Sequence, residues 1–316
     1  MQTTLVYVTI SLWHFNYNLA FVRQHHEDIG GIHDYYINFT TKGTTTGTSV
    51  SEAKYGHTKF SQLTDDQFKE LFLSDLRPVS RNTVKRKPLT PEHLKQLNIP
   101  QKLDWRTKLG YNVISPVKNQ NKCGGCWAFS TVETVESMYA IATGKAPTPL
   151  AVQEVIDCAY PNWGCSGGDT CVALDWMTKG TPLVSEAVYP LRDESDFCTI
   201  ITNKTRGIKV FVKSYTCNRG LPEDRLLELL QSGPVVAAVD AKTWQNYQGG
   251  IIQYHCESHI NHAVQIVGYD LTGPVPYYIV RNSWGTDFGH SGYLYIKVGD
   301  NLCGIAEEVS TVSVYL

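Results

Sequence analysis

Hydrophobic residues recur at intervals of three or four positions directly after Cys126. Phe129, Val132 and Val135 follow this spacing, and Gly144 interrupts it. The spacing places apolar side chains on one face of a helix, and a glycine commonly ends a helix. The sequence therefore predicts a helix that begins at or near Cys126. Unpaired backbone N–H groups at such a start favour a thiolate over a thiol, so Cys126 is a candidate nucleophile.

The remaining pattern divides the region after Cys126 into a helical half and a strand-rich half. Helices are predicted at 150–158 and at 169–179, where Asp169 can act as the N-cap. From about residue 235 onward, β-branched and aromatic residues separated by Gly and Pro predict strands. Upstream, residues 64–73 predict a further helix. These elements favour an α+β fold.

Two of the predicted strands carry the polar residues that a nucleophilic cysteine needs. Residues 261–269 alternate like a half-buried strand with His262 at its start, and 278–285 form an apolar run that ends in Asn282-Ser-Trp-Gly. A reactive thiol needs a base within hydrogen-bond reach, and the base needs a group that fixes its tautomer. Taken singly, a histidine in an apolar strand is more often a core residue, and Asn-Ser can be a simple turn. Together with Cys126, they predict a catalytic set.

Cys123 and Cys126 also have the C-x-x-C spacing of a redox pair or of half a zinc site. Zinc would need a second pair of ligands, and we expect His255 and His259, which flank Cys256, not to supply it. A redox pair would normally open a small βαβ domain, whereas a long segment precedes Cys123 here. We therefore expect no metal and no cofactor.

Composition narrows the class of protein further. Hydrophobic residues make up 42% of the 316 positions, which suffices for a globular core, and this length suggests about two domains. The formal net charge is −2 and no basic stripe is visible, so nucleic acid is not an expected partner. No apolar run reaches the roughly 18 residues that a membrane-spanning helix requires, so we expect no membrane span.

The segment Cys123-Gly-Gly-Cys126-Trp is similar to the C-G-[SA]-C-[WY] signature of papain-like cysteine peptidases, with Gly125 as the one departure. In that signature a His and an Asn follow about 130–150 residues later, and His262 and Asn282 follow Cys126 by 136 and 156 positions. On these motifs the chain resembles this family from about residue 99 to its end. The resemblance implies a helical lobe that faces a β-barrel lobe, with a propeptide at 21–98 and a peptidase domain at 99–316.

The resemblance also implies a role for each catalytic residue. Cys126 matches the nucleophile, His262 the general base and later acid, and Asn282 the residue that orients the imidazole. Gln120 matches the side-chain donor of the oxyanion hole, with the backbone N–H of Cys126 as second donor. The substrate-binding residues that the resemblance implies are Gly167, Gly168, Asn261, Trp284 and Glu308.

Glu308 stands five positions after Cys303, where the family places the floor of the pocket for the substrate residue two before the scissile bond. A carboxylate at the end of an apolar slot can pair bidentately with a guanidinium. We therefore expect this pocket to accept Arg as well as Leu or Phe. The alternative is that Glu308 points to solvent, as charge is tolerated beside it at Glu307.

Nine cysteines fit one reactive thiol and up to four disulfides. The resemblance implies three of the pairs, Cys123 with Cys165, Cys158 with Cys198, and Cys256 with Cys303. It does not account for Cys171 and Cys217, which either form an additional bridge or stay free. Structural disulfides imply an oxidising compartment.

The N-terminal region carries the signals for targeting and processing. Residues 5–13 are apolar and make 1–20 a candidate signal peptide, although no Lys or Arg precedes them; the alternative is an irregular N-terminus. Sequons at Asn38 and Asn203 fit the secretory route. Residues 56–62 resemble a propeptide motif of the family, and a basic segment lies at 85–87. The expected localisation is lysosomal or secreted.

The function predicted from these features is that of a cysteine endopeptidase made as a zymogen. It would hydrolyse protein and peptide substrates through an acyl-enzyme thioester, as a monomer sensitive to cystatin-type inhibitors, for lysosomal-type protein degradation. No long insertion that could block the cleft stands between Gly180 and Tyr189, so exopeptidase activity is not expected. One alternative is a catalytically silent homologue that binds peptides. The other is an acyl transferase with the same Cys-His chemistry.

Overall fold

The computed structural model describes residues 6–12, 15–21, 52–74, 88–199 and 207–316, and the chain divides into two units, Met1–Thr48 and Ser49–Leu316. In the first unit, strands β1 (Val6–Leu12) and β2 (Phe15–Phe21) pair antiparallel. The signal-peptide prediction for 1–20 covers these strands and stays a prediction. The sequons at Asn38 and Asn203 and the basic segment 85–87 lie outside the described residues.

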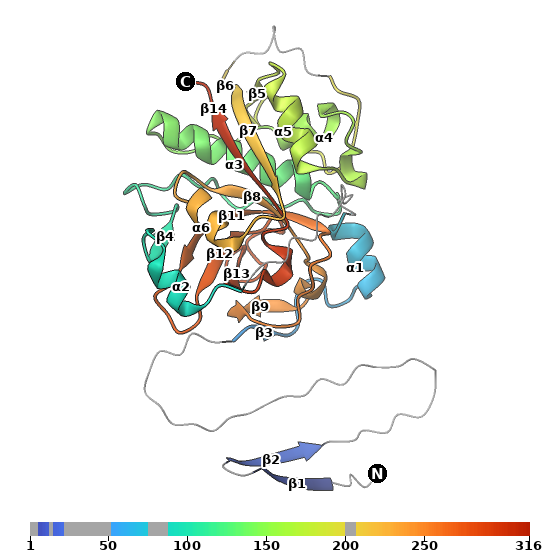
Figure 1. Cartoon of the computed structure of the whole chain (residues 1–316). Coiled ribbons are helices and arrows are strands. Elements are labelled where there is room, and N and C mark those ends of the chain that lie inside the picture. The colour runs from blue at the N-terminus through green and yellow to red at the C-terminus, as the bar shows by residue number, and fades with distance from the viewer. Residues whose placement is uncertain (1–5, 13–14, 22–51, 75–87, 200–206) are drawn as a thin grey trace. The chain divides into compact units, whose positions relative to one another are not determined.

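Three helices build the helical lobe, which occupies the upper half of Figure 1: α3 (Cys126–Thr143), α4 (Val152–Cys158) and α5 (Thr170–Thr178). Helix α3 begins at Cys126 and ends before Gly144, whose φ of 66° stops it, so the predicted start and end are confirmed. Asp169 caps α5 by accepting hydrogen bonds from the backbone N–H groups of Cys171 and Val172, at 2.7 and 3.0 Å. A core of buried apolar side chains from all three helices holds this lobe together.

The second lobe is built on an eight-stranded sheet, most of which lies in the lower half of Figure 1, with strand order β10-β13-β12-β11-β8-β14-β7 and with β4 paired to β11. Strand β11 is buried along its whole length, which places His262, its first residue, in the interior. The bounds are β4 (Lys102–Asp104), β7 (Val212–Arg219), β8 (Val235–Val239), β10 (Ile251–Ile252), β11 (His262–Asp270), β12 (Tyr277–Arg281), β13 (Tyr293–Lys297) and β14 (Glu308–Val314).

Shorter elements complete this unit. Helices α2 (Pro91–Gln96) and α6 (Glu223–Leu229) contribute Leu94, Leu226 and Leu227 to the core of the strand lobe. Two further pairs of strands are β3 (Lys54–Tyr55) with β9 (Tyr247–Gly249), and β5 (Leu183–Val184) with β6 (Lys209–Val210). None of the helices within the described ranges is both long and apolar enough to cross a membrane.

Strands β7 and β14 extend from the sheet up along the helical lobe (Figure 1). Val212 and Val312 on these strands belong to the core of the helical lobe. The strands predicted from about residue 235 onward are confirmed, and β14 at the end of the chain is one of them. The C-terminal strand has apolar residues that also cover helices α3 and α5, so it serves both lobes.

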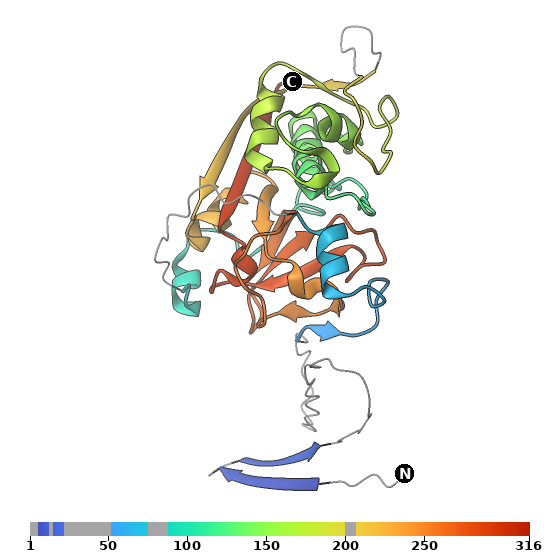
Figure 2. The ribbon, with the colours of Figure 1, turned by 90° about the vertical axis from the view of Figure 1, so that its right-hand side faces the viewer.

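The segment that precedes the peptidase region packs against the strand lobe. Helix α1 (Asp65–Phe72) starts at Thr64, which forms a reciprocal capping box with Gln67, so the helix predicted at 64–73 is confirmed. Figure 2 shows α1 in front of the boundary between the helices above and the strands below. The segment therefore lies across the line where the two lobes meet.

Aromatic side chains attach this segment to the strand lobe. Phe60, Phe68 and Phe72 are buried, and their ring centroids lie 5.5, 5.3 and 6.3 Å from that of Trp284. Fully burying a phenylalanine side chain contributes about 1.5–3 kcal/mol, so three of them hold the segment firmly. Phe60 belongs to the motif that resembles the propeptides of the family.

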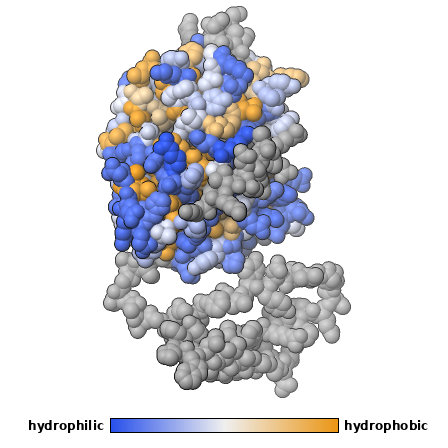
Figure 3. All heavy atoms as spheres, in the orientation of Figure 1, coloured by the Kyte–Doolittle hydropathy of each residue, from blue (hydrophilic) through white to orange (hydrophobic). Residues whose placement is uncertain are grey.

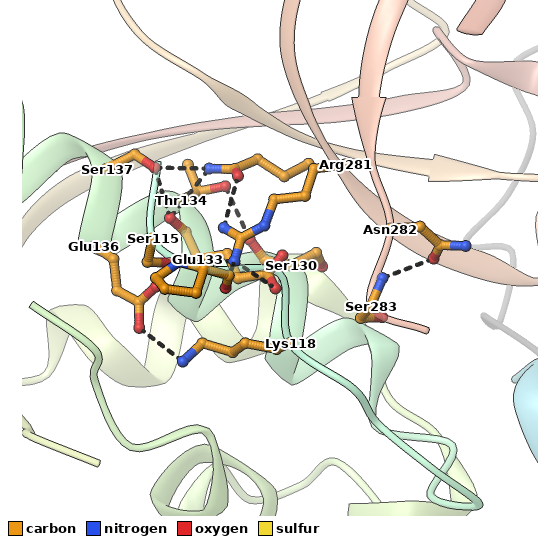
Figure 4. A network of polar contacts seen from close by, with 12 residues as sticks. Ser115, Lys118, Ser130, Glu133, Thr134, Glu136, Ser137, Arg281, Asn282 and Ser283 are labelled. Carbon is orange, nitrogen blue, oxygen red and sulfur yellow. Dashed lines mark hydrogen bonds and ion pairs between the residues drawn. The ribbon is translucent and has the colours of Figure 1, made fainter. Parts of the chain in front are cut away.

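A buried polar network joins the two lobes behind the candidate site, where side chains of α3 and β12 point toward one another (Figure 4). The Nη2 atom of Arg281 lies 3.3 Å from Oε1 of Glu133, and both side chains are almost fully buried. Nearby, Nζ of Lys118 lies 3.2 Å from Oε1 of Glu136. Arg281 immediately precedes Asn282, so this network ties the helix of Cys126 to the strand of Asn282.

Candidate active site

Cys126 is the first residue of α3 and the one cysteine in the described residues that forms no disulfide. Its side chain is buried in a small cluster with Ala238 and Ala263 from the strand lobe. The backbone N–H of Ala263, the residue after His262, is directed at the sulfur. The nucleophile candidate from one lobe therefore contacts the strand that carries the base candidate from the other.

His262 and Asn282 form the second part of the site. Nε2 of His262 lies 2.8 Å from Oδ1 of Asn282, and both residues are fully buried. An amide oxygen can only accept, so this contact places the imidazole proton on Nε2 and leaves the lone pair on Nδ1. The indole of Trp284 covers the pair, with its ring centroid 4.8 Å from that of His262. The imidazole thus has the tautomer that a general base for a thiol requires.

Gln120 supplies the third part of the site. Its Oε1 accepts a hydrogen bond of 2.6 Å from Oγ of Ser283, which fixes the amide orientation. The Nε2 group then donates to the carbonyl oxygens of Cys123, at 3.0 Å, and of Phe72, at 3.3 Å. An amide N–H oriented in this way and bound to a carbonyl oxygen from another segment is suited to stabilise an oxyanion.

The chain segment after α1 passes directly over this site. Ser74 donates its backbone N–H to the carbonyl of Asn261 at 2.7 Å, and its hydroxyl donates to the carbonyl of Gly124 at 2.9 Å. The same hydroxyl oxygen lies 3.4 Å from Sγ of Cys126. Together with the Phe72 carbonyl held by Gln120, these contacts place the N-terminal segment against both Gln120 and Cys126.

The other residues that the sequence pointed to surround this segment. A Cβ atom on Gly167, whose φ is 112°, would lie 3.2 Å from Cβ of Ser74, and one on Gly168 would lie 2.7 Å from the ring of Trp127. Glycine at these two positions therefore permits a close backbone approach. Asn261 contributes its backbone carbonyl, because its side chain is buried and bound to Asp240 at 2.8 Å.

Glu308 lies at the end of a row that starts at the nucleophile. In the sheet, Ala263 is opposite Ala238, and Ala238 is opposite Glu308. Residues directly opposite in antiparallel strands share a face, so the three side chains form one row beside Cys126. The family resemblance implies that this row lines a slot for a substrate side chain. Glu308 is only 7% exposed, which excludes the alternative that it points to solvent. Its carboxylate instead accepts hydrogen bonds from two side chains, one of which is Arg219.

Burial dominates the electrostatics of the site in this form of the protein. It raises the pKa of the Cys126 thiol, although hydrogen bonds from Ser74 and from backbone N–H groups oppose this. It also lowers the pKa of His262 to about 4. The sequence predicted a thiolate from the helix start alone. In the covered site the pKa shift has the opposite direction, because burial of the sulfur disfavours its charged form.

The four disulfides account for the other cysteines. Cys123–Cys165, Cys158–Cys198 and Cys256–Cys303 are bonded as the resemblance implied. Cys171 and Cys217 form the additional bridge, so they are not free. These last two sulfurs and Glu308 are the one group of potential metal ligands found among the described residues, but the sulfurs are bonded to each other.

A free cysteine at a helix start, set against a His–Asn pair from a second lobe, defines a two-lobe cysteine peptidase. The family model "Papain family cysteine protease" matches residues 99–313, and the chain belongs to this family. The chain is 43% identical to cathepsin O of Homo sapiens over 268 residues, which cover 84% of this chain and 81% of that protein. It is a cysteine endopeptidase similar to cathepsin O.

Solved structures agree with this assignment. Digestive procathepsin L2 from Tenebrio molitor is 31% identical with a TM-score of 0.71, and the match covers 83% of this chain and 84% of that one. Bromelain from Ananas comosus, solved in complex with the E64 inhibitor, is 33% identical with a TM-score of 0.62, over 68% of this chain and 99% of that one. The first match is to a proform and includes the N-terminal segment, so the α+β fold with a propeptide is confirmed.

Two residues at the site were not found by reading the sequence. Ser74 lies in a segment without a recognisable motif, and Arg219 lies in a strand without any special pattern. Only the folded chain brings them to Cys126 and Glu308, from 52 and 89 positions away. A local pattern cannot carry that information.

Proposed function

We propose that this chain is the zymogen of an endopeptidase in which Cys126, His262, Asn282 and Gln120 carry the reaction. The observation that supports this most strongly is the course of the segment at Phe72 and Ser74. It places a carbonyl on the Gln120 amide and a side chain at the thiol, as a substrate would, while α1 and its aromatic residues hold it down. Removal of the segment would open the site.

In the opened enzyme, His262 takes the proton of the Cys126 thiol through Nδ1. The thiolate sulfur then bonds to the carbonyl carbon of the substrate, and the negative charge on the carbonyl oxygen is stabilised by the Gln120 amide and the backbone N–H of Cys126. His262 returns the proton to the leaving amine, and a thioester remains. Water cleaves the thioester with His262 as base, which releases the acid and restores the thiol. Asn282 keeps the imidazole oriented throughout.

The substrate would bind as an extended peptide. Gly167 and Gly168 supply a backbone edge that can pair with it, as in strand addition. The carbonyl of Asn261, which now accepts from Ser74, would accept from a substrate N–H group instead. The slot that ends at Glu308 would take one substrate side chain. Protein and peptide substrates fit such a groove.

We further propose that the enzyme works as a monomer in a lysosomal or secreted setting and is inhibited by cystatin-type proteins. Four disulfides support an oxidising route of synthesis. The candidate signal peptide at 1–20 and the sequons support the same route. On the face shown in Figure 3, apolar residues are scattered among hydrophilic ones, which supports a monomer.

Labelling with E64, the inhibitor bound in the bromelain structure, tests the proposal. The full chain is activated by limited proteolysis, and both its labelling and its hydrolysis of a Phe-Arg fluorogenic peptide are measured. We expect labelling of wild type at Cys126 and none in Cys126→Ala, with hydrolysis lost in the variant. A catalytically silent homologue would show no hydrolysis in either protein. An acyl transferase would release the fluorophore only when an amine acceptor is added.

A further inference from the structure

The slot beside the nucleophile does not end in a free carboxylate. Oε1 of Glu308 accepts a hydrogen bond from the hydroxyl of Thr170 at 3.1 Å, and Oε2 accepts from Nε of Arg219 at 3.1 Å. Arg219 is directly opposite Glu308 on the neighbouring strand, so the ion pair follows from the register of β7 and β14. Both oxygens of Glu308 therefore already have partners within the chain.

A second carboxylate holds Arg219 in place. Oδ2 of Asp169 lies 3.3 Å from Nη2 of Arg219, while Oδ1 of Asp169 caps helix α5. Arg219 thus lies between Asp169 and Glu308 and balances one of their two charges. Its own side chain is 34% exposed, whereas that of Glu308 is 8% exposed. The guanidinium reaches in from the surface, and a substitution there need not disturb the core.

A covalent bond fixes the geometry of this group. The Cys171–Cys217 disulfide joins the residue after Thr170 to the residue two before Arg219. It connects helix α5, which supplies one partner of Glu308, to strand β7, which supplies the other. The bridge therefore ties together the two elements that supply the partners of Glu308.

We propose that Arg219 determines the specificity of this slot: by occupying Glu308, it makes the slot accept an apolar substrate side chain and exclude a basic one. A substrate arginine would have to displace Arg219 or bring a second guanidinium beside it, and like charges in a desolvated site repel each other. The proposal rests on the proposed endopeptidase function. The sequence alone led us to expect that the slot accepts Arg, because it gave no sign that the Glu308 carboxylate has a partner.

The test compares the hydrolysis of Phe-Arg and Arg-Arg fluorogenic substrates, which differ at the residue two before the scissile bond. The enzymes are activated full-length wild type and Arg219→Gln, assayed at pH 5.5 and 7.0 because burial raises the pKa of Glu308. We expect wild type to favour Phe-Arg. In Arg219→Gln the ratio of kcat/KM for Arg-Arg to kcat/KM for Phe-Arg should rise about tenfold or more. This factor corresponds to the free energy that one hydrogen bond to a charged group contributes.

Three further variants separate the possible causes. Lys213→Gln, on the same strand and exposed, should leave the ratio unchanged, and Arg219→Lys should retain most of the preference for Phe-Arg. Glu308→Gln added to Arg219→Gln should remove the gain, because the freed carboxylate is lost. An unchanged ratio in Arg219→Gln, or equal hydrolysis of both substrates by wild type, would overturn the proposal. If activated wild type does not hydrolyse the Phe-Arg substrate at all, the proposed endopeptidase function itself is contradicted.

Discussion

The hydroxyl oxygen of Ser74 lies 3.4 Å from the sulfur of Cys126 and donates its proton to the carbonyl of Gly124. The contact with the Ser74 hydroxyl lowers the pKa of the Cys126 thiol, whereas burial of the sulfur raises it, and burial is the larger effect. The net result is a raised pKa, so burial disfavours the thiolate in this covered site. Under the proposed function, the segment that carries Ser74 lies where substrate would bind and covers the sulfur.

This relationship predicts that weakening the covering segment activates the thiol. Phe68→Ala removes a buried ring that contacts Trp284, a change that costs about 3–5 kcal/mol in a packed core. The reaction of Cys126 with a small thiol-specific reagent in the unprocessed chain should accelerate at least roughly tenfold. The lost packing energy is large enough to increase the population of chains with an uncovered sulfur by this factor. Tyr55→Ala, an exposed aromatic residue of the same segment, is the control and should have little effect. Equal rates for Phe68→Ala and wild type would show that the segment does not shield the sulfur.

Gln120 is expected to act on the transition state. Gln120→Ala should lower kcat of the activated enzyme by roughly 10²–10³-fold with a smaller change in KM, because one oxyanion donor is lost. Thermal unfolding should be compared in parallel, since the Gln120 amide also bonds to Ser283 within the fold. Gln248→Ala, a more exposed glutamine of the strand lobe, serves as control. A variant that loses affinity but keeps kcat would argue against the oxyanion role.

Two buried carboxyl groups predict that the fold is more stable in acid. Burial raises the pKa of Glu133 and of Glu154 to about 7 from 4.5. A carboxyl group whose pKa is higher in the folded than in the unfolded state contributes its full stabilisation at pH values below the unfolded-state pKa. This stabilisation is lost as the pH rises to about 7. The Tm should therefore fall between pH 5 and 7.5. In Glu154→Gln, which keeps an acceptor for the Val184 N–H, the fall should be smaller, whereas an identical pH profile would contradict the buried ionisation.

The disulfide pattern predicts a single titratable thiol. Alkylation of the unfolded, unreduced chain should modify Cys126 alone, as detected by peptide mass spectrometry. Replacing both Cys171 and Cys217 by Ser should lower the free energy of unfolding by about 3–4 kcal/mol, which loop closure gives for a bridge of this span. Two additional alkylated cysteines in wild type would mean that this bridge does not form in solution.

Much of the site could be predicted because its parts carry local signals. Cys126 begins a helix whose apolar spacing and terminal Gly144 are visible in the sequence, and both helix ends are confirmed. His262 starts a strand and Asn282 follows one, as the sequence predicted, but the strand at His262 is buried along its whole length, not half-buried as its alternation indicated. These features depend on hydrophobic periodicity, helix capping and turn residues within a few positions, and all three can be read directly from the sequence.

The tertiary structure alone decided the state of that site. Ser74 meets Cys126, Arg219 meets Glu308, and the strand that begins at Glu308 closes the helical lobe as well as the sheet. Burial raises the pKa of the Cys126 thiol, which is opposite to the direction expected at the start of a helix. Contacts between residues far apart in the chain depend on how whole elements pack. Charge, burial and specificity follow from those contacts, so they appear only in the folded molecule.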